Sequence, residues 1–477
     1  MGVLNGRQVL RHGIFAVAMG AVGAAASIVL CLVADAAFGL TERAPWLLFC
    51  LPLLAAASLA LYRWHGVALN TTTRLVARCI RSDEHLSAWL APDILAGTAL
   101  SLLGGASVGK EAGALQMGAS LGQLVGRPFR LRSVYRADDE RGRGSVGMNA
   151  YAASMGMACA FSALFFAPLG SAAFVVELTG YRREVVRHLP TILLGCAVAW
   201  AVATAVGIGD VIPPVALPGL SWPVVGDCVL VGVVAGLAGG LFGGAIDHVQ
   251  RATEHFRRNY YLWAILGAAL FVGLVVLCGW QAFEGAGGSL LAAALDGRAG
   301  SWDFAVKALL TVICLGFWLR GGEIMPTFTI GALLGASCTV MTGGDAALSA
   351  AAGLAAFFCT MSRCPLAAFL MACEIFGFTG APLFALAVGT AYLVGRGEGY
   401  YALGATSFVR DLAHRHRGSR SGHPGSAAPV AVTPDRGSQP TGEGCARDIV
   451  DKIVDASRSD AAAVEDELEM RSDKAAK

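Results

Sequence analysis

A glycine-rich stretch inside an apolar run is the clearest candidate for chemistry. Residues 104–118 read GGASVGKEAGALQMG, which predicts a turn that opens a helix at Glu111. Glycines leave the backbone amides accessible, and the unpaired N–H groups of a helix start attract an anion together with the helix dipole. A carboxylate placed there competes with the anion and leaves when it is protonated. Glu111 is therefore a candidate gate that couples an anion to a proton, and a purely structural helix cap is the alternative.

The same stretch resembles a nucleotide-binding P-loop only superficially. Gly-x4-Gly-Lys is present from Gly104 to Lys110, but Glu111 stands where Ser or Thr must bind magnesium, and no strand is expected before it. Nucleotide binding is therefore set aside. The 13 cysteines include no C-x-x-C pair and lie mostly in apolar runs, so neither a metal site nor a disulfide framework is indicated, and no cofactor is expected.

A second glycine-glycine break precedes another expected helix start. Residues 320–332 read RGGEIMPTFTIGA. If the two halves of the chain are inverted, this helix start faces the first one across a single site. Neutral amides from both sides then hold an anion weakly enough to release it. A hinge that merely lets two helices pack closely is the alternative.

The two breaks belong to a faint internal repeat. Residues 166–177 (FAPLGSAAFVVE) are similar to 363–374 (RCPLAAFLMACE), and 113–122 are similar to 326–335. The matches are in the same order, at offsets of 197 and 213 residues, which indicates two related halves. Such repeats usually meet at the substrate site. Chance similarity between Gly/Ala-rich helices is the competing explanation.

The composition indicates that the elements that position these residues are apolar helices in a membrane. Of 477 residues, 55% are hydrophobic and 15% charged, against about 25% charged in a soluble domain. This is the composition of a polytopic membrane protein, and the net charge of +2 gives no reason to expect nucleic acid. Several apolar runs are interrupted, and broken helices at membrane depth are tolerated where they line a cavity, so a transporter or channel is expected. The interruptions are Gly104-Gly105, Gly109, Pro168, Gly321-Gly322, Pro326 and Pro365.

The chain divides into a membrane domain and a polar tail. Residues 1–410 are expected to form the transmembrane domain, with repeats at about 45–208 and 225–410. Residues 411–477 are rich in Ser, Gly, Pro and charge and are expected to be largely disordered, with a surface helix at 446–470 as one option. The arginines near the N-terminus, in the loop 127–143 and at the start of the tail predict a cell-membrane protein with both termini cytoplasmic.

The motifs in combination resemble the CLC family of chloride channels and chloride/proton antiporters, over about residues 10–410. They are Gly-Lys-Glu-x-Gly, Gly-Gly-Glu-Ile-x-Pro-Thr-Phe, and Pro-Leu…Glu after each. The resemblance implies an all-α membrane fold of two inverted repeats of tilted and broken helices, and a homodimer with one pore per subunit in the lipid bilayer. It also implies transport of chloride or another halide, with protons as a second substrate, and a gating glutamate at Glu111. The candidate anion-binding residues are Thr73, Gly109, Lys110, Ala112, Gly113, Glu323, Ile324 and Tyr401, with Tyr400 as an alternative to Tyr401.

Departures from the family pattern leave several points open. Lys110 and Ala112-Gly113 replace the usual Arg and Gly-Pro around the gating glutamate. The family's Gly-Ser-Gly-Ile-Pro turn is not recognisable, and counting back from Glu111 puts it at residues 71–75, where Thr73 is the best match for the pore serine. A helix cap is the other option for that threonine.

The inner proton-relay glutamate of the antiporters is also missing, because Leu178 occupies its place. This loss is compatible with a channel and with the fluoride-exporting branch, and it leaves Glu177 and Glu374 as structural helix-end residues. The tail is too short for the paired regulatory domains of eukaryotic members.

Chloride transport has three alternatives. The Gly-Gly-Glu-Ile-x-Pro-Thr-Phe variant resembles the branches that include fluoride exporters, although chloride remains the first choice on family frequency. An inverted-repeat transporter for an organic anion would need a larger cavity with charged or aromatic side chains. An intramembrane enzyme is set aside, because the apolar runs contain no H-E-x-x-H, no G-x-S-x-G and no paired aspartates.

Overall fold

A computed structural model describes residues 5–133, 147–209, 212–213, 215–256, 259–395 and 400–401. All of them lie in one compact unit, Met1–Val432. Within these ranges the secondary structure is helical, apart from one isolated backbone bridge between Gly109 and Gly322. Seven of the described helices are long and apolar enough to cross a membrane. The expected all-α, polytopic membrane fold is confirmed.

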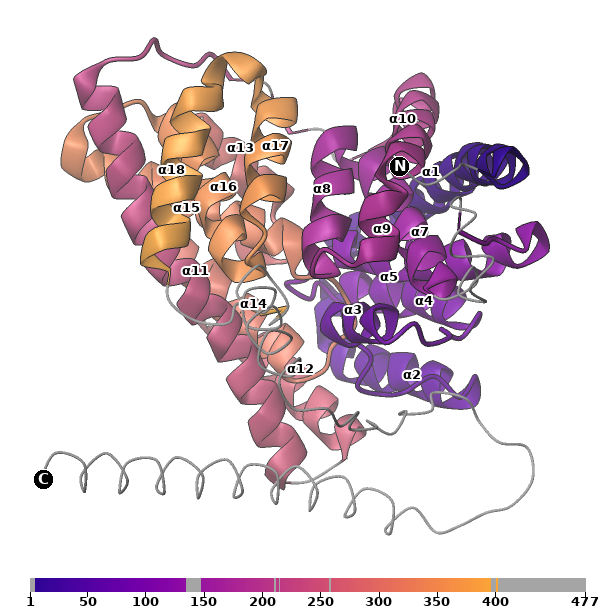
Figure 1. The fold of residues 1–477 in the computed structure, drawn as a ribbon. Coiled ribbons are helices and arrows are strands. Elements are labelled where there is room, and N and C mark those ends of the chain that lie inside the picture. Colours follow the sequence, from indigo (N-terminus) through magenta and orange to yellow (C-terminus); the bar gives the residue numbers. More distant parts are fainter. Residues whose placement is uncertain are drawn as a thin grey trace, which may run out of the picture. The chain divides into compact units, whose positions relative to one another are not determined.

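The helices of the first half and those of the second half group on two sides of the molecule (Figure 1). The first half consists of α1 (Gly6–Arg43), α2 (Leu51–Trp64), α3 (Thr73–Arg81), α4 (Leu90–Leu103), α5 (Glu111–Gly126), α7 (Met148–Phe165), α8 (Pro168–Leu178), α9 (Arg183–Arg187) and α10 (Leu189–Val206). The second half consists of α11 (Trp222–Phe256), α12 (Tyr260–Cys278), α13 (Gly288–Leu295), α14 (Asp303–Gly316), α15 (Ile324–Thr342), α16 (Ala346–Ser362), α17 (Pro365–Phe376) and α18 (Ala381–Val394).

The two halves are structural repeats. Helices α4 and α14 start 213 residues apart, as do α5 and α15, while α8 and α17 start 197 residues apart, which are the offsets of the sequence matches. The packing partners repeat as well: α5 packs on α7 and α15 on α16, and α1 packs on α10 and α11 on α18. The repeat predicted from the sequence is therefore confirmed.

The repeats are inverted, as α8 and α17 show. The two helices pack side by side in the middle of Figure 1. Glu374 near the end of α17 accepts hydrogen bonds from the start of α8, and Glu177 near the end of α8 accepts them from the start of α17. Each glutamate thus caps the other repeat's helix, so the helices are antiparallel, and both glutamates have the structural role expected from the sequence. The donors, at 2.7–3.1 Å, are the backbone N–H groups of Leu169, Gly170, Leu366 and Ala367.

Glycines set the close packing of the helices that carry the site. A Cβ atom on Gly118 of α5 would lie 2.4 Å from the carbonyl oxygen of Gly156 in α7. At the equivalent positions of the second repeat, a Cβ on Gly331 of α15 would lie 2.6 Å from the carbonyl oxygen of Gly353 in α16. Small residues let membrane helices approach this closely, which accounts for the high glycine content.

One expected helix break is placed differently. Pro326 does not interrupt a helix but lies in the first turn of α15, where its missing N–H is tolerated. The run 324–360 is instead divided at Gly343, which ends α15 with a positive φ of 67°. The tail 411–477, including 446–470, and most of the arginine-rich loop lie outside the described residues. The repeat boundaries at about 45–208 and 225–410 stay a prediction.

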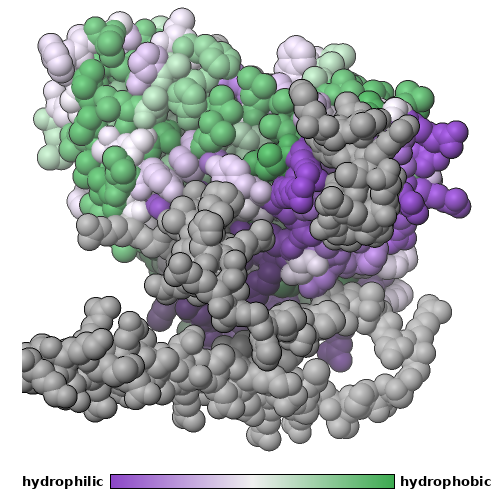
Figure 2. All heavy atoms as spheres, in the orientation of Figure 1, coloured by the Kyte–Doolittle hydropathy of each residue, from purple (hydrophilic) through white to green (hydrophobic). Residues whose placement is uncertain are grey.

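Apolar side chains cover much of the outer surface. Figure 2 shows hydrophobic residues over much of the upper part of this face, where α10, α17 and α18 lie. Large apolar side chains such as Leu241, Met341 and Leu393 are 75%, 83% and 81% exposed. A soluble surface rarely exposes so many, whereas hydrocarbon tails accommodate them, as a membrane-embedded fold requires.

Candidate functional site

The two glycine-rich loops meet directly. Gly109 N donates to Gly322 O at 2.7 Å, and Gly322 N donates to Gly109 O at 2.6 Å. These residues are 213 apart, the offset that relates α5 to α15, so the bridge joins equivalent positions of the two repeats. Each loop residue lies two positions before the first residue of its helix. The bridge therefore holds the starts of α5 and α15 next to each other.

A side chain at either bridge position would have to displace a neighbouring group. A Cβ on Gly109 would lie 2.0 Å from Glu111 Oε2, and a Cβ on Gly322 would lie 2.7 Å from Ala112 N. Both distances are shorter than any real Cβ contact. The missing side chains therefore leave room for the Glu111 carboxylate beside the bridge.

The Glu111 carboxylate lies at the start of the opposite repeat's helix. Its Oε2 accepts a hydrogen bond from Met325 N at 3.2 Å, and the side chain is fully buried. The first hydrogen bonds between successive turns are donated by Ala114 N in α5 and Thr327 N in α15. The backbone N–H groups before them have no acceptor within their own helix and point out of the helix start. A negative charge at this place interacts favourably with two helix dipoles. The carboxylate thus lies in a site suited to an anion.

The other predicted residues around Glu111 are buried in the same region. Ala112 and Gly113 follow Glu111 in the first turn of α5, and Ile324 begins α15. Lys110 precedes α5, and its Nζ forms an ion pair with Asp35 of α1 at 2.6 Å. Lys110 therefore ties the loop before α5 to α1, a contact that its sequence position did not reveal.

Glu323 supplies a second buried carboxyl group, which the sequence identified only through its backbone amide. Its side chain is 3% exposed, and Tyr401 Oη donates to Glu323 Oε1 at 2.6 Å. A charged residue at a break inside an apolar run is itself a functional signal in membranes. That signal was available in the sequence, but the pairing with Tyr401, 78 positions away, was not.

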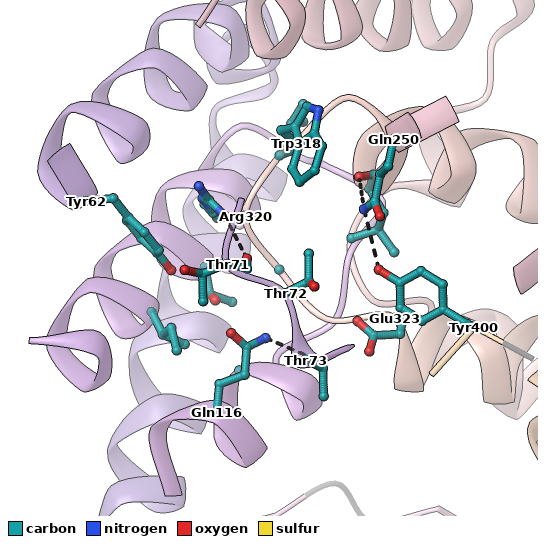
Figure 3. A pocket seen from close by; sticks show the side chains of 16 residues that line it. Tyr62, Thr71, Thr72, Thr73, Gln116, Gln250, Trp318, Arg320, Glu323 and Tyr400 are labelled. Carbon is teal, nitrogen blue, oxygen red and sulfur yellow. Dashed lines mark hydrogen bonds between the residues drawn. The ribbon is translucent and has the colours of Figure 1, made fainter. Parts of the chain in front are cut away.

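A small polar cavity of about 30 Å³ adjoins Glu323 (Figure 3). About 10–15 Å³ is enough for one water, so the cavity holds one or two water-sized particles, whereas a pocket for an organic ligand needs about 300 Å³ or more. An organic anion does not fit. The polar lining comes from both repeats: Tyr62, Thr71, Thr72, Thr73, Thr98, Gln116, Gln250, Trp318, Arg320, Glu323 and Tyr400.

The threonine turn before α3 lines this cavity. Thr73 is buried as the first residue of α3, and its hydroxyl oxygen accepts from Gln116 Nε2 at 3.0 Å. The helix cap is the neighbouring Thr72, whose hydroxyl oxygen accepts from Leu75 N at 3.3 Å. Tyr400 also lines the cavity and contacts Gln250, whereas Tyr401 bonds to Glu323. The anion-binding roles of these residues stay predictions.

The position expected for an inner relay glutamate carries no charge. Leu178 is the last residue of α8 and is buried. The carboxylate of the adjacent Glu177 accepts hydrogen bonds from Leu366 N and Ala367 N at the start of α17. A proton that crosses this protein therefore does not use a carboxylate at that position.

Inverted repeats, helix starts that meet inside the membrane domain, and a buried carboxylate among backbone amides define a membrane protein that transports small anions. The chain belongs to the family described as "Voltage gated chloride channel", whose sequence profile matches residues 53–396. The resemblance to CLC proteins is thus confirmed. The activity of the family is transmembrane transport of chloride or a similar small halide, through channels or proton-coupled exchangers.

Individual relatives agree with this assignment. The chain is 30% identical over 394 residues to a "Chloride/fluoride channel protein" of Pseudomonas syringae pv. tomato, covering 79% of this chain and 82% of the relative. It is 25% identical over 288 residues to the "H(+)/Cl(-) exchange transporter ClcA" of Vibrio cholerae, covering 57% of this chain and 58% of the relative.

Solved structures show the same fold. The crystal structure of a CLC-type fluoride/proton antiporter superposes with a TM-score of 0.75 at 25% identity, covering 83% of this chain and 98% of the other. A slow cyanobacterial Cl⁻/H⁺ antiporter superposes with a TM-score of 0.68 at 18% identity, covering 87% and 100%.

Proposed function

We propose that the protein exchanges a small halide for protons and that Glu111 is the group shared by both ions. The observation that carries the proposal is the hydrogen bond from Met325 N to Glu111 Oε2. This bond supports the proposal because converging helix starts favour an anion at the place that a protonatable carboxylate occupies.

The exchange follows because the Glu111 carboxylate and the halide compete for the same place at the start of α15. Ionised Glu111 accepts from Met325 N at the start of α15 and excludes a halide. When Glu111 is protonated it loses its charge, the carboxyl group withdraws, and a halide takes the hydrogen bond from Met325 N. On the cavity side of the bridge, Glu323 with its Tyr401 hydroxyl is a second buried group that can hold a proton. The predicted anion ligands Thr73, Ile324 and Gly113 border the same path.

Fluoride is the second candidate for the cargo, next to chloride. The observation in its favour is that two of the relatives, one by sequence and one by structure, carry fluoride in their names. The cavity of about 30 Å³ admits either ion. Parallel flux measurements with chloride and fluoride decide between them.

We also propose a homodimer in the cell membrane with both termini cytoplasmic. The outer faces of α8 and α17 carry apolar residues at equivalent positions, Leu169 and Leu366, which are 42% and 47% exposed. A self-complementary contact suits a twofold assembly. The arginines at positions 7 and 11 support the orientation. Chemical cross-linking in membranes tests the dimer, and cysteine accessibility near each terminus tests the orientation.

Glu111 variants test the exchange. In proteoliposomes, halide efflux and proton uptake are recorded together for the full chain, for Glu111→Gln and for Glu111→Ala. Both substitutions are expected to abolish proton movement while halide flux persists. Glu42→Gln, at an exposed position of α1, is the matched control and is expected to behave as wild type. Proton coupling retained in Glu111→Ala would refute the assignment.

A further inference from the structure

A buried aspartate and a partly exposed histidine form a pair away from the bridge. His65 Nδ1 and Asp93 Oδ1 are 2.5 Å apart, and the side chains are 22% and 0% exposed. Oδ2 of Asp93 has no hydrogen-bond partner among the described residues. A carboxylate buried in an apolar helix is costly and indicates a function in membrane proteins. Nothing in the anion site described above uses this pair.

His65 lies where the membrane domain meets water. It follows the last residue of α2, and its ring stacks on Trp89 with ring centres 4.3 Å apart. Trp64 and Trp89, on either side of it, are 85% and 55% exposed. Exposed tryptophans at helix ends mark the membrane–water interface. The imidazole is therefore within reach of solvent protons.

Asp93 lies next to the lining of the polar cavity. One turn further along α4, at Gly97, a Cβ atom would lie 3.2 Å from the Arg320 side chain and 3.3 Å from the Tyr62 ring. Residues four apart share a helix face, so Asp93 lies on the face of α4 that Gly97 turns towards Arg320 and Tyr62. The charged and titratable groups that act on Asp93 are His65, Arg320 and Tyr62.

We propose that His65 and Asp93 form a proton relay between the solvent and the cavity that adjoins Glu323. The pair has solvent at one end and the cavity lining at the other, and the cavity has room for the water that completes the path. This inference rests on the proposed proton coupling and adds the route by which protons reach Glu323.

The relay transfers one proton without net chemical change. A solvent proton binds Nε2 of His65, and the proton on Nδ1 moves along the short hydrogen bond to Oδ1 of Asp93. The neutral carboxylic acid then passes its proton to a cavity water, which delivers it to Glu323. His65 is left in its other tautomer and returns by ring rotation or by the reverse transfer.

Arg320 makes the last transfer depend on the halide. Its guanidinium lies over the Tyr62 ring at 4.2 Å and donates to the carbonyl oxygens of Leu69 and Thr71. This fixed charge opposes a second positive charge in the cavity. A halide in the cavity offsets the charge of Arg320, so proton delivery is favoured when the anion is present.

Ratio measurements in proteoliposomes test the relay. Asp93→Asn removes the proton acceptor at nearly constant shape, and His65→Gln removes the titratable ring. Each is expected to lower the number of protons moved per halide at least tenfold while halide flux continues. The matched controls are the exposed Asp296→Asn and His248→Gln, which should keep the wild-type ratio. A third variant, His65→Ala, is assayed with and without added imidazole, which is expected to restore proton movement.

The outcomes separate the relay from the exchange itself. A wild-type ratio in Asp93→Asn or His65→Gln overturns the relay, as does an equal fall of both fluxes, because a purely structural role gives that result. If Asp93→Asn fails to assemble, His65→Ala decides: restoration by imidazole supports the relay, and no restoration overturns it. A wild-type chain that moves halide but no protons overturns the proposed exchange as well.

Discussion

The mutual capping of α8 and α17 allows the inverted repeat to be tested by stability. Glu177 and Glu374 each accept two backbone hydrogen bonds at 2.7–3.1 Å. A hydrogen bond to a charged group contributes about 1.5–3 kcal/mol. Glutamine keeps one acceptor oxygen and loses the other, so Glu374→Gln is expected to destabilise the fold by about 2 kcal/mol. Glu374→Ala loses both bonds and is expected to cost about 4 kcal/mol.

The near symmetry of the two caps adds a second comparison. The backbone bonding is the same in both repeats, but Glu177 also accepts a hydrogen bond from Tyr181 Oη at 3.2 Å, so Glu177→Gln is expected to destabilise the fold by at least as much as Glu374→Gln. Thermal denaturation of the purified protein in detergent, recorded for both variants and for the control Glu42→Gln, provides the comparison. The double variant should show the sum of the two shifts, since the caps share no donor. A shift no larger than that of Glu42→Gln, or a clearly smaller shift for Glu177→Gln than for Glu374→Gln, would refute the reasoning.

Three further predictions concern the gate, the cavity and the tail. Gly109→Ala places a Cβ 2.0 Å from Glu111 Oε2, so it should displace the carboxylate and raise halide flux at neutral pH towards that of Glu111→Ala; an unchanged flux would contradict this. Thr73→Ala removes the hydroxyl that accepts from Gln116 and faces the cavity, and is expected to weaken halide binding about tenfold or more, as measured by isothermal titration. Unchanged binding in alanine variants of all three threonines, 71–73, would show that this turn does not border the site. Deleting residues 420–477 should leave assembly and flux close to those of the full chain; a truncated protein that assembles but loses flux would identify a regulatory tail.

Sequence patterns predicted the fold well where they reflect backbone constraints. The glycine pairs at 104–105 and 321–322 ended apolar runs, and both helix starts follow them within a few residues. The repeat offsets predicted two related halves, since each repeat needs the same breaks in the same order, whereas their inversion was implied only by the resemblance to the CLC family. Pro326 was interpreted as a break because proline interrupts helices, but its position in the first turn made it harmless.

Side-chain partners were much harder to predict. Glu323 was found through its motif, yet its hydrogen bond to Tyr401 joins residues 78 positions apart in the chain. Asp93 follows a proline in an ordinary apolar run, and only the structure brings His65 to it from the end of α2. Such contacts join residues on different helices, and no local spacing encodes them.

The hydrogen bonds between the repeats limit how this protein can move. Two backbone bonds join Gly109 to Gly322, and four more link the caps of α8 and α17 across the same boundary. Rocking one repeat as a rigid body against the other would break all six at once, at a cost of about 8 kcal/mol or more. Rotating the Glu111 side chain about its own bonds breaks the hydrogen bond from Met325 N and leaves those six intact. Opening and closing of the path is therefore a small-amplitude event, and the backbone of the open protein should superpose closely on that of the closed one.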